Sequence, residues 1–136
     1  MHRTARAANG IRHACYRTVP RQHVVQIMSP DACVAGRAEV ANTFGSRLIG
    51  LLGRDGLAPG SALVLKPSGL IHTAFMRFPI DVLFLDGRQR VVAKATDLQP
   101  FRVAWGGWKA RMAVELPAGT IQRFELPIGT TLQFIP

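Results

Sequence analysis

The most informative stretch of the chain is Ile80-Asp81-Val82-Leu83-Phe84-Leu85, followed at once by Asp86-Gly87. Five of its first six residues are apolar, and most favour β-structure, which predicts a strand over residues 80–85. Successive side chains alternate across a strand, so Asp81 shares one face with two leucines while the other face is wholly apolar. We therefore expect a strand buried on both faces. Asp86-Gly87 predicts a hairpin that leads into a second strand over residues 90–95.

Similar apolar runs recur on both sides of this hairpin, and a helix is predicted before it. Residues 44–52 carry apolar side chains at helical spacing, with Asn42 or Thr43 as the N-cap and Gly53 after the end. The fold class expected is α+β: a single small domain with a barrel-like, mostly antiparallel sheet of about seven short strands and one principal helix. Residues 62–95 should form a meander. The candidate strands cover residues 38–41, 62–65, 70–75, 80–85, 90–95, 112–116, 121–124 and 131–135.

One five-residue motif occurs twice. Glu115-Leu116-Pro117-Ala118-Gly119 returns ten residues later as Glu125-Leu126-Pro127-Ile128-Gly129. Proline and glycine take the positions that suit a turn. The repeat predicts two similar corners of the sheet, with a duplicated binding site as the alternative.

Length and charge limit the possible functions. The 136 residues suit one domain, and 48% hydrophobic residues predict a true core. Residues 1–30 hold five arginines and no acidic residue, which predicts a flexible basic extension before a globular domain over residues 31–136. A mitochondrial presequence and a translation start at Met28 are the alternatives. The net charge of +9 thus falls largely on the extension and argues weakly for a polyanionic partner. We expect no transmembrane segment, because no apolar run is long enough, and the chain as written predicts a cytoplasmic protein but leaves its compartment open.

Polar residues near the central strand form the first candidate site. A buried Asp81 needs a partner, because an isolated buried carboxylate is costly. Arg47 and Arg77 are the expected partners, and His72 lies nearby in the sequence. Such a cluster would bind an anion or move a proton. The alternative is an internal salt bridge that joins helix to sheet.

A glycine loop with two tryptophans is the second candidate. In Trp105-Gly106-Gly107-Trp108-Lys109 the aromatic rings and the cation would stack a sugar or a base, or merely close one end of the barrel. The candidate ligand-binding residues are therefore Arg47, His72, Arg77, Asp81, Trp105 and Trp108. We expect no metal and no cofactor, because Cys15 and Cys33 show no zinc-ligand spacing with the histidines.

Several short motifs stand in a characteristic order and spacing: Ala41-Asn42-Thr43, Arg47, residues 50–54, residues 78–86, Val91-Val92, residues 114–119 and Gly129. With these motifs the chain resembles the domain-of-unknown-function 192 family over residues 38–136. The resemblance implies a compact α+β domain with a barrel-like sheet, no established activity, and relatives that are often exported or membrane-anchored. Arg47, Pro79 and Asp81 match the family pattern. A Trp-Met-x-Asn-Thr element of many members is replaced here by His72-Thr73-Ala74-Phe75-Met76.

Three functions follow as hypotheses. The first is a small non-catalytic binding or accessory module with a small anionic or sugar-like ligand, because no nucleophile or metal motif is present. The second is a small enzyme that uses the His/Asp/Arg cluster on an anionic substrate. The third is an electrostatic binder of nucleic acid or a membrane surface. A nucleic-acid partner is not expected, because no known basic recognition motif occurs.

Overall fold

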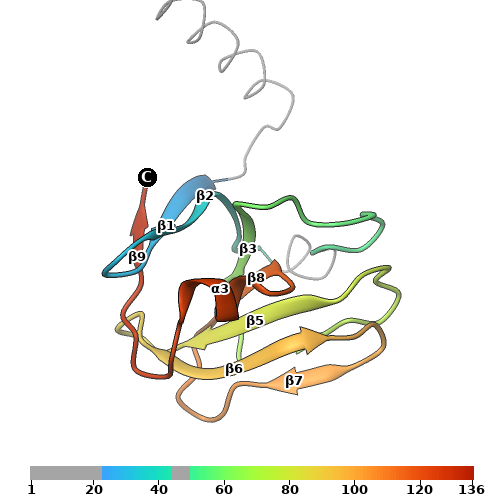
Figure 1. Ribbon diagram of the computed structural model, residues 1–136. Coiled ribbons are helices and arrows are strands. Elements are labelled where there is room, and N and C mark those ends of the chain that lie inside the picture. Colours follow the sequence, from blue (N-terminus) through green and yellow to red (C-terminus); the bar gives the residue numbers. More distant parts are fainter. Residues whose placement is uncertain (1–22, 44–49) are drawn as a thin grey trace, which may run out of the picture.

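The computed structural model describes residues 23–43 and 50–136, which form one curved sheet, a separate two-stranded ribbon and a short helix (Figure 1). No helix in these residues has the length and hydropathy needed to cross a bilayer. The strands are β1 (His23–Met28), β2 (Cys33–Ala41), β3 (Ser61–Leu65), β4 (Leu70–His72), β5 (Ile80–Leu85), β6 (Val91–Leu98), β7 (Val103–Trp105), β8 (Met112–Pro117) and β9 (Gln133–Ile135), and the helix is α3 (Thr120–Phe124).

The main sheet has seven strands in the order β6-β5-β8-β3-β2-β1-β9. All neighbours are antiparallel except β2 and β3, which run parallel. The sheet is a half-barrel, which confirms the expected single α+β domain with a mostly antiparallel, barrel-like sheet. The predicted meander over residues 62–95 is wrong beyond the β5–β6 hairpin. β8 separates β5 from β3, and β4 leaves the sheet to pair with β7.

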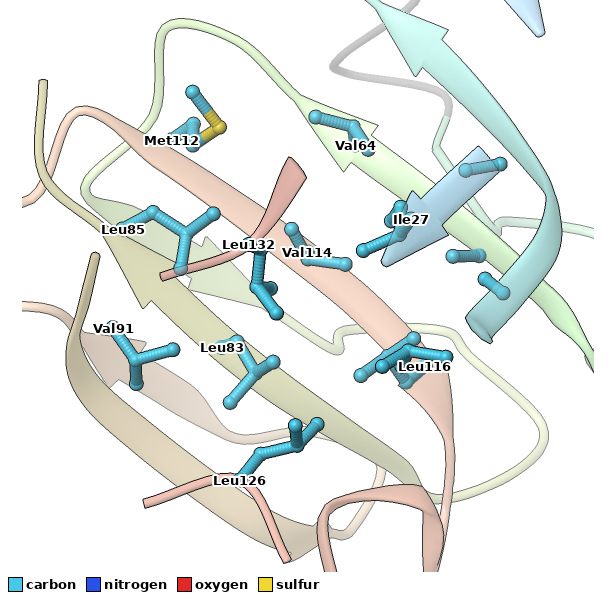
Figure 2. Close-up of a cluster of buried hydrophobic side chains, with 14 of the residues drawn as sticks. Ile27, Val64, Leu83, Leu85, Val91, Met112, Val114, Leu116, Leu126 and Leu132 are labelled. Atoms are coloured by element: carbon cyan, nitrogen blue, oxygen red, sulfur yellow. The ribbon is translucent and has the colours of Figure 1, made fainter. Parts of the chain in front are cut away.

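The sheet has an apolar core on each face, because side chains alternate along its central strands. In β5, Leu83 and Leu85 join one cluster, while Ile80, Val82 and Phe84 join the other. All six β5 residues are buried, as the sequence predicted. Figure 2 shows the first cluster, which β9, α3 and the turns around them complete with residues such as Leu126 and Leu132. The second cluster is covered by residues 51–57 and by the β4–β7 ribbon.

Two local predictions differ from the structure, and a third lies mostly outside the described residues. The predicted helix over residues 44–52 lies mostly outside the described residues, and its last three residues form a turn. Residues 121–124, predicted as a strand, belong to helix α3. The sheet begins at His23, eight residues before the expected domain boundary, because apolar residues of β1 such as Ile27 pair with β2 and enter the core.

The repeated motif forms two matching corners, as predicted. Gly119 and Gly129 both have positive φ, at 93° and 97°. The threonine after each glycine donates its hydroxyl to the carbonyl of the proline in the same motif, Thr120 to Pro117 at 2.6 Å and Thr130 to Pro127 at 2.7 Å. The motif is therefore a turn signal at both positions.

Candidate functional site

Asp81 is a structural acceptor at the start of α3. Its side chain is 1% exposed, and its carboxylate accepts three backbone N–H groups. Oδ1 accepts from Asp97 at 2.8 Å, and Oδ2 accepts from Gly119 at 3.0 Å and from Ile121 at 2.9 Å. These bonds join β5, β6 and the first corner of the repeat, and they offset the cost of burying the charge.

The expected cluster around Asp81 does not assemble among the described residues. Arg77 is exposed and pairs with Asp55 at 2.8 Å, so it is not the partner of Asp81. His72 is exposed on β4, where its Nδ1 accepts the backbone N–H of Ala74 at 3.3 Å. Arg47 lies outside the described residues. Neither Arg77 nor His72 bonds to Asp81, and the hypothesis of an enzyme built on this cluster stays a prediction.

A groove with both polar and apolar lining residues lies beside the start of α3. Its volume is about 840 Å³, and Lys94, Asp97, Gln122 and Glu125 are among its lining residues. Asp81 also borders it, but three backbone N–H groups already engage its two oxygens. The described residues contain no group of three or more His, Cys, Asp or Glu side chains that would hold a metal ion.

The clearest candidate surface lies on the β4–β7 ribbon. Ile71 of β4 and its partner Ala104 of β7 pack against the second core cluster. Because side chains alternate along a strand, the neighbours of Ile71 and Ala104 face outward. Among them, Leu70 lies opposite Trp105 and His72 lies opposite Val103. Six of the eight exposed large hydrophobic side chains of the described chain lie on this ribbon or in its adjoining turns. We call them the aromatic surface: Leu70, Phe75, Phe101, Val103, Trp105 and Trp108.

At one end of the ribbon, two phenylalanines stand on strained turns. Phe75 and Phe101 have φ of 62° and 61°, a region that bulky residues seldom occupy. Their rings meet edge to face, with centroids 5.4 Å apart, and both side chains are mostly exposed. Left-handed backbone costs about 1–2 kcal/mol per residue. Strain that holds aromatic rings in solvent points to a functional surface.

The buried Thr73 holds these two turns together. Its hydroxyl donates to the carbonyl of Gln99 at 2.7 Å and accepts the N–H of Arg102 at 2.8 Å. Its backbone N–H donates to the carbonyl of Arg102, and its carbonyl accepts the N–H of Phe101. Thr73 therefore bridges the turn that carries Phe101 and joins it to the turn that carries Phe75.

At the other end of the ribbon, Gly106 and Gly107 determine where Trp105 and Trp108 lie. A Cβ at Gly106 would overlap the buried ring of Phe84, so the backbone lies directly on the core there. Gly107 has a φ of 88°, which turns the chain outward. Trp105 and Trp108 meet edge to face at 5.2 Å and are 57% and 86% exposed. The alternative, that this loop closes one end of the barrel, stays a prediction.

Cations lie at both ends of the aromatic surface. Residues 66–78 and 99–111, which build the ribbon and its turns, contain five lysines and arginines and no acidic residue. Arg102 donates to the carbonyl of Phe101 at 3.4 Å, and Arg111 donates to that of Trp108 at 2.9 Å. A guanidinium thus lies at each aromatic end. Lys109 is exposed next to Trp108.

A second buried carboxylate lies in the sheet at Glu115 of β8. It is 3% exposed, and its Oε2 has no hydrogen-bond partner among the described residues. Burial raises the pKa of Glu115 from 4.5 to about 7, and the nearby charge of Arg54 partly opposes this. Arg54 itself pairs with Glu39 at 3.0 Å beside a small cleft.

The sequence pointed to Trp105 and Trp108, but not to the rest of the surface. Phe75 was placed inside a strand over residues 70–75, which is wrong, because β4 ends at His72 and a turn follows. One feature of the sequence could have identified the rest of the aromatic surface. The absence of acidic residues over residues 66–78 and 99–111 marks both segments of the ribbon.

Together these features define a small half-barrel domain with an exposed aromatic and cationic face. The chain belongs to the family described as "DUF192: Uncharacterized ACR, COG1430", which matches residues 25–134. The UPF0127 protein of Pyrococcus abyssi is 31% identical over 106 residues, which cover 74% of this chain and 87% of that protein. The UPF0127 protein of Pyrococcus horikoshii is 31% identical over 105 residues, which cover 73% and 88%.

A solved structure shares the fold. A crystal structure of a protein of unknown function from Novosphingobium aromaticivorans matches with a TM-score of 0.73 and 18% sequence identity. The match covers 82% of this chain and 84% of that one. It shows the fold alone. The chain is thus an uncharacterised member of the UPF0127/DUF192 family.

Proposed function

We propose that this domain is a non-catalytic binding module that docks through its aromatic surface onto a partner whose apolar face carries negative charge. One observation carries the proposal: six large apolar side chains are exposed together on one ribbon and its turns. Monomeric proteins seldom expose apolar patches larger than a few hundred Å², and such patches mark interaction sites.

The backbone supports a binding role. The aromatic rings are held out by left-handed phenylalanines, by the Thr73 hydrogen bonds and by Gly106 against the core. A surface ordered before binding loses less conformational entropy on docking. The cations beside it supply the charge complementarity that an anionic partner needs.

Tryptophan fluorescence tests this proposal directly. The protein has two tryptophans, and both lie on the aromatic surface, so their emission reports on this surface alone. The full chain is titrated with three anionic amphipathic probes: acidic lipid vesicles, a single-stranded oligonucleotide and an acidic amphipathic peptide. We expect at least one to shift the emission to shorter wavelength.

Matched variants separate the surface from its surroundings. The double variant Leu70→Ser/Val103→Ser keeps both tryptophans and should lose the response, because it removes the two aliphatic side chains of the surface. Ile128→Ser removes an equally exposed apolar side chain elsewhere and should keep it. A chain that responds to none of the three probes, or only to a neutral oligosaccharide, would overturn the proposal.

A further inference from the structure

We infer that the partner of the aromatic surface is an anionic lipid bilayer, which the ribbon enters at the boundary between headgroups and acyl chains. This inference rests on the proposed function and names its partner. It follows from the kind of apolar side chains present, from the way the rings are paired and from the placement of the cations.

Two side chains of the surface are aliphatic. Leu70 lies opposite Trp105, Val103 lies opposite the exposed His72, and the two aliphatic side chains are 59% and 66% exposed. A nucleic acid would gain little from them, because bases stack on aromatic rings and need a flat π-face. Acyl chains accept aliphatic and aromatic groups alike. Leu70 and Val103 therefore favour lipid.

The aromatic pairs also suit a bilayer better than a row of bases. The rings of Phe75 and Phe101 are inclined by 72°, and those of Trp105 and Trp108 by 86°. In each pair one ring turns its edge toward the face of the other, so no two rings offer parallel platforms. Tryptophan with an apolar body and a polar N–H is enriched where membranes meet water.

The cations lie where lipid headgroups would be. Arg102 and Arg111 are tied to the backbone of Phe101 and Trp108, and Lys109 is exposed beside them. A cation near an anionic membrane surface strengthens binding about fivefold. Arg102, Lys109 and Arg111 together therefore predict about 100-fold tighter binding to anionic than to neutral vesicles at low salt.

The test uses the full chain and vesicles of equimolar phosphatidylcholine and phosphatidylglycerol, with vesicles of phosphatidylcholine alone as the control. Lipids brominated on the acyl chains quench tryptophans that reach them. We expect quenching and a blue shift of the emission with the anionic vesicles. The triple variant Arg102→Gln/Lys109→Gln/Arg111→Gln should bind them about 100-fold more weakly. Leu70→Ser/Val103→Ser should lose tenfold or more, and Ile128→Ser should bind like the wild type.

The outcomes distinguish the two proposals. If vesicles bind but brominated lipid does not quench the tryptophans, another part of the chain, such as its arginine-rich start, makes the contact and the inference is overturned. If the oligonucleotide or the acidic peptide shifts the emission and vesicles do not, the inference falls while the proposed function stands. If no probe acts on the tryptophans, both fall.

Discussion

Glu115 should make the stability of this domain fall between acidic and neutral pH. Its pKa is about 7 in the folded protein, against 4.5 for an ordinary glutamate, because burial penalises the charged carboxylate. Below pH 4.5 both the folded and the unfolded chain hold the proton, so this group costs nothing. As pH rises from 4.5 to 7 the unfolded chain releases the proton first, and the free energy of unfolding declines. Above pH 7 the full cost is present.

The size of the effect follows from the two pKa values. One unit of difference between the folded and the unfolded pKa corresponds to about 1.4 kcal/mol. Ionised Glu115 therefore lowers the free energy of unfolding by about 3 kcal/mol at pH 8. Glu115→Gln stays neutral at every pH. It should therefore be more stable than the wild type at pH 8 by about 3 kcal/mol and similar to it at pH 4.5; the attraction of Arg54 is already contained in the pKa of about 7.

Urea unfolding of both proteins from pH 4.5 to 8.5 measures this difference, and other titrating groups cancel in it. Glu125→Gln is the matched control, because Glu125 holds the same position in the repeated motif but is exposed. A constant difference between the wild type and Glu115→Gln across this pH range would refute the reasoning. So would an equal pH dependence of the Glu125→Gln difference.

Four further predictions concern the candidate site and its supports. Phe101→Gly should be about 1 kcal/mol more stable than Phe101→Ala by thermal unfolding, because glycine relieves the left-handed strain; equal stability would contradict the strained turn. Gly106→Ala should lose about 1–3 kcal/mol against the ring of Phe84, whereas Gly87→Ala, which meets no atom, should change little in the same assay. Thr73→Val should cost about 1–3 kcal/mol and Thr73→Ser much less, since serine keeps the hydroxyl; a similar loss in both would point to packing instead. Asp81→Asn should cost about 2–3 kcal/mol, because its amide NH₂ would face backbone N–H donors, and a neutral result in urea unfolding would remove Asp81 as the acceptor that holds α3.

The fold was predictable where a short run of neighbouring residues determines the local structure. The run Ile80–Leu85 with Asp86-Gly87 predicts β5 and its hairpin, and both are present. The two Pro-x-Gly motifs predict two similar corners for the same reason. Strand order was not predictable. β8 lies between β5 and β3 and pairs with both through backbone hydrogen bonds, while the side chains of all three strands enter the two cores; no local pattern states that pairing.

The candidate site, too, was predictable only in part from the sequence. Sequence alone identified Trp105-Gly106-Gly107-Trp108 and the need of Asp81 for a partner, because ring, glycine and carboxylate chemistry belong to single residues. It named arginine as that partner, whereas the fold supplies three backbone N–H groups that come from distant elements. The gathering of Leu70, Phe75, Phe101 and Val103 with the tryptophans depends on the pairing of β4 with β7, about thirty residues apart in the sequence. The chemistry of single residues can be predicted from the sequence. Which residues share a surface depends on the long-range pairing of strands, and that pairing is established only when the two cores are packed.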